Sequence, residues 1–125
     1  MNHHADPSIP DQIPEPVGWK ILVKPIEIRT TTAGGLELPP ETLESLKYLR
    51  NVGQVIAMGP DCYSHPKFCE SPPWCQVGDW VRFSPHAGAK EMIRGADGEP
   101  LELRYINDDE VQGRADSPDI WWQEL

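Results

Sequence analysis

Three cysteines and one histidine lie close together in the middle of the chain and form a candidate set of metal ligands. They are Cys62, His65, Cys69 and Cys75, in the spacing Cys-x2-His-x3-Cys-x5-Cys. Thiolates and an imidazole in a short, turn-rich segment can close tetrahedrally on zinc, and such a site would stabilise a loop that lacks its own core. The last gap is longer than in standard zinc motifs. The alternative is therefore three free cysteines packed as small apolar residues.

The acidic run Asp108, Asp109 and Glu110 is the other feature with obvious acid–base or cation-binding chemistry. It lies at the expected start of a strand, where such a run is usually a solvated turn, and we interpret it so. His86 has no partner nearby in sequence and is interpreted as a surface residue. The chain contains no Gly-rich dinucleotide or phosphate loop, no Gly-x-Ser-x-Gly and no His-Glu-x-x-His. The sequence therefore does not predict an enzyme.

The segment from Thr30 to Pro40 suits neither a helix nor the interior of a strand, because it combines a glycine pair with a double proline. In extended backbone, Leu36 and Leu38 point to one side and Glu37 to the other. A flexible polar segment with two apolar side chains at its tip is suited to an apolar groove on another protein. The alternative is an ordinary loop whose leucines pack back onto the domain.

Composition limits the class of protein. A chain of 125 residues is long enough for one domain. Its formal net charge of -9 argues against nucleic acid and anionic membranes as partners. No apolar window is long enough for a membrane span or a signal peptide, so we expect the cytoplasm. Three cysteines are an odd number, which excludes a complete disulfide framework and fits reduced thiols.

The 14 prolines and 10 glycines separate short apolar runs, which predicts many short strands joined by turns and thus a small, all-β, barrel-like domain. The expected strands lie at 19–23, 52–58, 80–83, 92–93, 101–105 and from 111 onward. Turns are expected at Gly78, Gly88 and Asp97-Gly98. Residues 41–50 suit a short helix or a continuation of the flexible segment. Residues 1–15 are predicted to be a flexible Pro-rich arm with little apolar surface, and 115–125 a tail.

Four stretches in fixed order carry a family resemblance. They are Pro16 to Lys24 followed by Gly34-Gly35-Leu36-Glu37-Leu38, then Val52 to Gly59, Val77 to Phe83, and Gly88-Ala89-Lys90. In order and spacing they resemble the GroES family, the co-chaperonins that cap chaperonin rings. Trp19, Glu37 and Ala87 depart from the family's usual residues. The segment 61–76 lies where the family has its roof hairpin but shares no motif with it.

The resemblance implies a small irregular GroES-like β-barrel over residues 16–114, with a mobile loop at 29–42 and a roof hairpin or loop at 61–76. It implies a homo-oligomer, a heptameric ring, in which the first and last strands, Lys20–Val23 and Val111–Arg114, pair across subunits. Gly34, Gly35, Leu36, Glu37 and Leu38 would then bind a GroEL-type chaperonin in a nucleotide-dependent manner. Client proteins would be enclosed indirectly, and no cofactor is implied.

Two other functions compete with this one. The first is a zinc-stabilised small β-barrel interaction module with 61–76 as its functional site. The second is an enzyme, because zinc-dependent alcohol dehydrogenases contain a GroES-like barrel, although this chain lacks their dinucleotide-binding half. The unusual roof segment and long tails suggest a divergent, phage-encoded version of the family. In that case the expected cytoplasm is that of the host.

Overall fold

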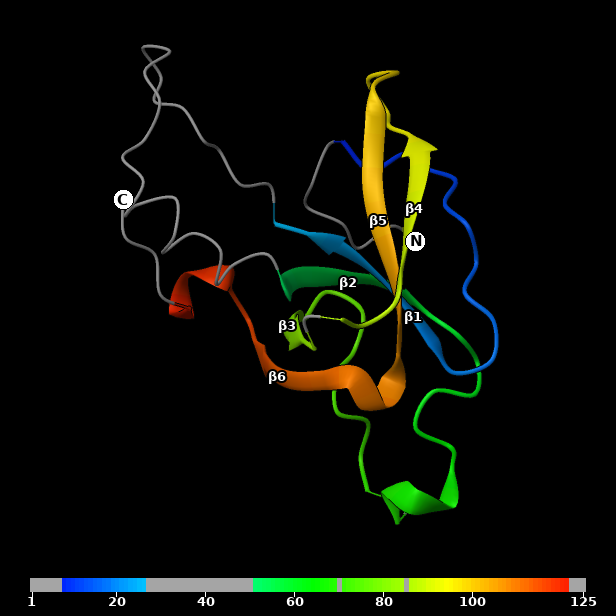
Figure 1. Ribbon diagram of the computed structural model, residues 1–125, viewed down its shortest axis with the longest axis vertical. Helices are drawn as coiled ribbons and strands as arrows, with labels where there is room; N and C mark the ends of the chain where they lie inside the picture. The colour runs from blue at the N-terminus through cyan, green and yellow to red at the C-terminus, as the bar shows by residue number, and fades with distance from the viewer. Residues whose placement is uncertain (1–7, 27–50, 70, 85, 122–125) are drawn as a thin grey trace.

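The computed structural model describes residues 8–26, 51–69, 71–84 and 86–121, and its strands are labelled in Figure 1. The strands are β1 (Lys20–Pro25), β2 (Val52–Met58), β3 (Trp80–Phe83), β4 (Ala89–Arg94), β5 (Pro100–Asn107) and β6 (Val111–Ala115). The described residues also contain three short 3₁₀ helices: η2 (Pro66–Phe68) lies between β2 and β3, η3 (Asp108–Glu110) lies between β5 and β6, and η4 (Pro118–Ile120) follows β6. No helix in this described part of the chain is long and apolar enough to cross a membrane.

The six strands form one antiparallel sheet in the order β4-β5-β1-β2-β3-β6. The sheet curls around one main core, to which β1, β2, β3, β5 and β6 all contribute. That core contains Ile21, Val23, Val55, Val81, Phe83, Ile106 and Val111, together with Tyr63, Phe68, Cys75 and Ala87. The expected small, all-β, GroES-like barrel is confirmed.

Strand β1 is buried on both faces. Ile21 and Val23 face the main core, whereas Leu22 packs on the opposite face in a second apolar cluster. This explains why the strand is an unbroken apolar run rather than an alternating one. Both of its edges are already paired within the chain, with β2 on one side and β5 on the other. The expected pairing of Lys20–Val23 with Val111–Arg114 of another subunit is therefore wrong.

Two of the predicted strands, β2 and β3, have the bounds expected from the sequence. The turn before β3 is closed by a hydrogen bond from the Asp79 N–H to the Gln76 carbonyl (3.0 Å), with Gly78 at φ 99°. The predicted β4–β5 hairpin is also present. Its turn has Gly98 at φ 85°, a left-handed conformation that favours glycine.

Residues 8–16 lie along the sheet rather than away from it (Figure 1, blue). Ile9 is only 4% exposed, and Ile13 is half-buried against the same cluster. The expectation that the N-terminal arm carries little apolar surface is wrong for these residues. At the other end, η4 follows β6 and Trp121 is half-buried, while Trp122 lies outside the described residues.

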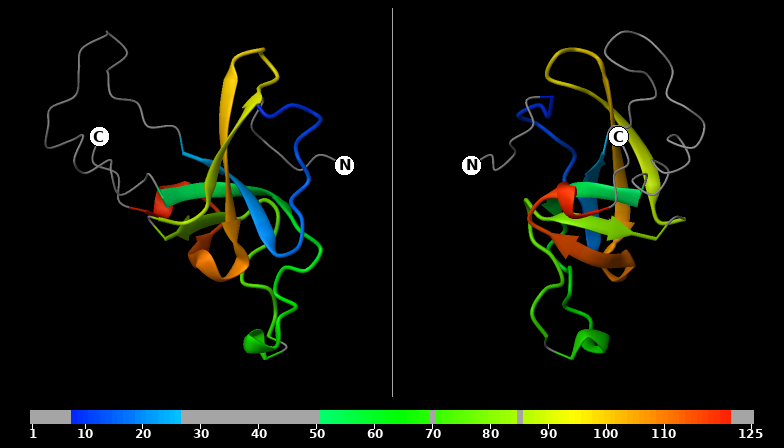
Figure 2. Two further views of the ribbon diagram at one scale, coloured as in Figure 1. Left: turned by 45° about the vertical axis from the view of Figure 1, so that its right-hand side comes forward. Right: turned by 90° about the vertical axis from the view of Figure 1, so that its left-hand side faces the viewer.

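The segment 61–76 projects from one end of the barrel (Figure 2, green). Its described residues contain η2 and no strand. Of the two forms expected for this segment, a hairpin or a loop, the loop is the one present. It is nevertheless anchored, because Tyr63, Phe68 and Cys75 are buried in the main core.

Candidate functional site

The segment 27–50 leaves the sheet and returns to it at adjacent positions. Its flanking strands, β1 and β2, are hydrogen-bonded neighbours, and Pro25 lies opposite Gly53. Beyond that pair, the Ile26 N–H donates to the Val52 carbonyl at 2.9 Å. The five candidate docking residues are Gly34, Gly35, Leu36, Glu37 and Leu38; they lie outside the described residues, as does the expected helix at 41–50. The described strands hold both ends of this segment side by side.

The pairing at this base depends on the absence of a side chain at Gly53. A Cβ there would lie 2.8 Å from the Lys24 carbonyl oxygen and 3.1 Å from the Pro25 Cα. Both neighbours are backbone atoms, so they cannot move aside as a flexible side chain would. Gly53 therefore permits the close approach of β1 and β2 at the base of segment 27–50.

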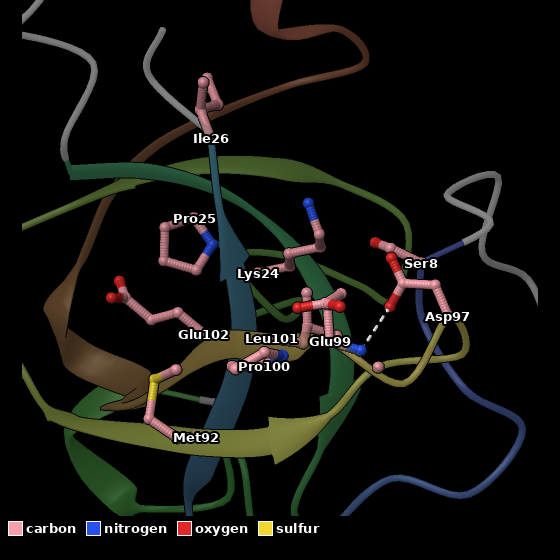
Figure 3. Close-up of a pocket in the computed structure, with 11 residues that line it drawn as sticks. Ser8, Lys24, Pro25, Ile26, Met92, Asp97, Glu99, Pro100, Leu101 and Glu102 are labelled. Carbon is pink, nitrogen blue, oxygen red and sulfur yellow. Dashed lines mark hydrogen bonds between the residues drawn. The ribbon is translucent and has the colours of Figure 1, made fainter. Parts of the chain in front are cut away.

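A groove of about 460 Å³ lies beside this base (Figure 3). Lys24, Pro25 and Ile26 form one wall, and the β4–β5 hairpin forms the other. Ser8 and Asp97 lie together at one end of the groove (Figure 3). The N-terminal arm, the hairpin turn and the base of segment 27–50 thus meet in one place.

The projecting segment is held to the barrel through Tyr63 and Asp108. The Tyr63 N–H donates to Asp108 Oδ2 at 2.8 Å, and the Tyr63 hydroxyl donates to the Asp108 carbonyl at 2.8 Å. Asp108 is 4% exposed, so the prediction of a solvated turn is wrong for this residue. Tyr63 has φ 63°, which costs a non-glycine residue roughly 1–2 kcal/mol. The two hydrogen bonds and the buried ring offset that cost.

Three aromatic rings of the projecting segment pack against one another. Tyr63 and Phe68 meet edge-on with centroids 5.1 Å apart, and Phe68 and Trp74 do the same at 5.0 Å. Such pairs contribute about 0.5–1.5 kcal/mol each beyond their burial. Tyr63 and Phe68 extend the main core into this loop and Trp74 packs against them, so aromatic contacts stabilise the loop, which is the role that zinc would take in the alternative hypothesis.

The four candidate zinc ligands have separate partners. His65 Nδ1 accepts from the Lys67 N–H at 3.0 Å and caps η2. Cys62 donates to the Lys20 carbonyl, Cys69 is exposed, and Cys75 lies 3.5 Å from the Tyr63 hydroxyl. Among the described residues, no three His, Cys, Asp or Glu side chains are grouped to hold a metal ion. Of the three cysteines, only Cys75 is buried as the packed alternative expects, whereas Cys62 is half-buried and Cys69 is exposed.

Burial raises the pKa values of two thiols and one phenol in this segment. Burial raises the pKa of the Cys62 thiol from 9.0 to about 11, and burial likewise raises the pKa of Cys75. Burial, followed by its hydrogen bond to Cys75, raises the pKa of Tyr63. Because zinc binds the thiolate, these protons would have to leave before Cys62 or Cys75 could bind the metal.

A sequence model described as "Chaperonin 10 Kd subunit" matches residues 14–106. Co-chaperonins GroES from Clostridium botulinum strains Hall, Langeland and Okra are each 34% identical over 96 residues, which cover 77% of this chain and 90% of each relative. The chain belongs to the chaperonin 10 kDa subunit family. The resemblance drawn from sequence motifs is thereby confirmed. Members of this family are co-chaperonins rather than enzymes, in agreement with the prediction of no catalytic site.

Two features of this co-chaperonin family member were missed by sequence reasoning. Asp108 was grouped with its solvated neighbours, although the run Asp108-Asp109-Glu110 forms η3 and only its first carboxylate is buried. Ile9 was assigned to a flexible arm. In both cases the partner lies far away in sequence, so no local pattern indicates the contact. The prediction of His86 as a surface residue is confirmed.

Proposed function

We propose that this chain is the lid subunit of a GroEL-type chaperonin, which it caps in a nucleotide-dependent manner so that client proteins fold in the enclosed space. Family membership supports the co-chaperonin role. The observation that supports a binding site at segment 27–50 is the pairing of β1 with β2, which holds the two ends of that segment next to each other. Gly34 to Leu38, within the loop 29–42, are the proposed docking residues.

The energetics suit a releasable lid. Burying Leu36 and Leu38 in an apolar groove contributes roughly 3–6 kcal/mol before costs. Ordering a flexible loop on binding consumes much of this, so one loop alone binds weakly. Several loops on one ring reach useful affinity through effective concentration. A weak contact repeated around a ring can also be released as a unit, which a cycling lid requires.

The ring is proposed to be a heptamer in the cytoplasm. Within the described residues, β6 pairs on one side with β3 and is an end strand of the sheet. An end strand presents unpaired backbone groups that another chain can satisfy. The other end strand, β4, carries Lys90, Glu91 and Arg94, and charges of this kind discourage edge pairing. We therefore place the contact between subunits at β6.

Native mass measurement tests this function. The 14.1 kDa chain is expected to run as a seven-membered ring alone, and to join a GroEL-type chaperonin when ATP is added. The same mixture without nucleotide is the control. A monomer across micromolar concentrations, or a ring that never joins the chaperonin, would contradict the proposal. A monomer that carries zinc would favour the interaction module instead.

A further inference from the structure

Residues 8–13 precede the region matched by the family, which begins at residue 14, yet they make specific contacts with the barrel. Ile9 is 4% exposed and packs with Leu22, Ile56 and Leu103. These three side chains come from β1, β2 and β5 and lie on the face of the sheet opposite to the main core. The arm therefore covers a second apolar face that the sheet alone would leave open to water.

The same arm reaches the turn of the β4–β5 hairpin. The Ala96 N–H donates to the Ser8 carbonyl at 3.0 Å. A Cβ built on Gly95 would lie 3.2 Å from that carbonyl oxygen, so the arm and the turn are in close contact. Figure 3 shows Ser8 beside Asp97 at this end of the groove. Adjacent residues of the arm thus contact the sheet face through Ile9 and the hairpin turn through Ser8.

The inner part of the hairpin is held by the pairing of β1 with residues 104–107 of β5, whereas among the described strands its outer part pairs only within the hairpin. Strand β4 pairs with β5 alone, and the hairpin extends away from the body of the barrel in Figures 1 and 2. This outer part is a two-stranded ribbon, which is marginally stable without packing against a further element. Half-buried Ile93 and Leu101, one from each strand, belong to the same cluster as Ile9. The arm supplies the further element.

We propose that residues 8–13 are an intrachain strap, anchored by Ile9, that clamps the β4–β5 hairpin to the barrel and seals its second apolar face. The strap also fixes one end of the groove beside segment 27–50, because Ser8 and the hairpin turn both line that groove. This inference does not depend on the chain's action as a lid, since it concerns contacts within one subunit.

Hydrogen exchange on the full-length protein tests the strap, with Ile9→Ser as the variant and Val17→Ser as its matched control. Val17 is in the same region but is 73% exposed, so its loss removes little packing. Ile9→Ser is expected to speed exchange of the Ala96 amide at least about tenfold, because that amide is bonded to the residue beside the anchor. Amides between β1 and β2 should keep their protection. Ile9→Val should behave as the parent.

Three outcomes would overturn the proposal. The first is an Ala96 amide that exchanges equally fast in Ile9→Ser and the parent. The second is an equal acceleration in Val17→Ser. The third is a general loss of protection in Ile9→Ser that includes the β1–β2 amides, which would make Ile9 part of a single cooperative core. Should Ile9→Ser fail to fold, Ile9→Ala is measured by the same criteria, and failure of both variants counts as the third outcome.

Discussion

Tyr63 and Asp108 join the projecting segment to the barrel through two hydrogen bonds of 2.8 Å, one from the backbone N–H of Tyr63 and one from its hydroxyl. The two residues are 45 positions apart, and both are buried. Asp108 thus accepts two hydrogen bonds from Tyr63, one at its carboxylate and one at its backbone carbonyl. Tyr63 itself has a left-handed backbone conformation. The orientation of segment 61–76 depends on this pair.

Asp108→Ala is expected to destabilise the fold by about 1–3 kcal/mol, because it leaves the buried Tyr63 N–H without an acceptor. Asp109→Ala is the matched control: it removes the neighbouring carboxylate, whose ion pair with Lys67 is exposed and contributes at most about 1 kcal/mol. Urea denaturation of both variants gives the comparison. Equal losses from the two substitutions would show that the Tyr63–Asp108 contact is not a principal anchor.

Gly53→Ala is expected to destabilise the base of segment 27–50, because the new Cβ would lie 2.8 Å from the Lys24 carbonyl oxygen. Forced overpacking of this kind typically costs about 1–3 kcal/mol. Gly113→Ala is the control, since within one subunit its Cβ would meet nothing within 4 Å; because it lies in β6, the proposed subunit contact, the mass of the ring is checked for both variants. Thermal unfolding should separate the two variants clearly. A Gly53→Ala protein as stable as Gly113→Ala would mean that β1 and β2 can move apart without cost.

Stability is expected to fall at alkaline pH. The Cys62 pKa is raised from 9.0 to about 11, chiefly by burial, and burial also raises the pKa values of Cys75 and Tyr63. The folded state therefore holds these protons more tightly than the unfolded state. The contribution of Cys62 is complete below about pH 9 and is lost as pH rises through about 11, and the other two groups lower stability in the same direction. Denaturation midpoints from pH 7 to 11 measure this.

Cys62→Ser is the control for that pH series, because a serine hydroxyl does not titrate in this range. The variant should lose less stability between pH 9 and 11 than the parent, although Cys75 and Tyr63 still contribute. Identical profiles would show that Cys62 plays no part in the alkaline transition. A stability that rises over this interval would contradict the sign of all three shifts.

Protein purified without added metal is expected to contain far less than one zinc per chain. Cys62 and Cys75 hold their protons and His65 caps η2, so the candidate ligands have other roles. A chelator should leave the unfolding temperature unchanged. Elemental analysis measures the metal directly. Stoichiometric zinc, lost together with stability on chelation, would support the zinc-stabilised module.

Local patterns in the sequence predicted much of the sheet. Strands β2 and β3 are short apolar runs bounded by glycine or proline, and the Asp97-Gly98 step marks the hairpin turn. These signals depend only on residues close together in the sequence, so they can be recognised without knowledge of the tertiary structure.

The order of the strands and the buried polar contacts could not be predicted in this way. The resemblance implies that Lys20–Val23 pairs with another subunit, but pairing with β2 and β5, distant in sequence, places β1 inside the sheet. Ile9 is an isolated apolar residue among prolines and polar residues, and its burial depends on Leu22, Ile56 and Leu103. The docking residues Gly34 to Leu38 lie outside the described residues and stay a prediction.

The most direct test of the lid function is nucleotide-dependent chaperonin binding by Leu36→Ala, Leu38→Ala and Glu37→Val, with ring assembly measured on the same samples. Each leucine change removes about 1–3 kcal/mol per loop. Repeated around a ring, either change should all but abolish capping and leave the ring intact. Glu37→Val, the matched control, should bind as tightly as the parent or more tightly, because it removes a charge beside an apolar groove. If Leu38→Ala capped as well as the parent, or broke the ring instead, the proposed docking of segment 27–50 would be wrong.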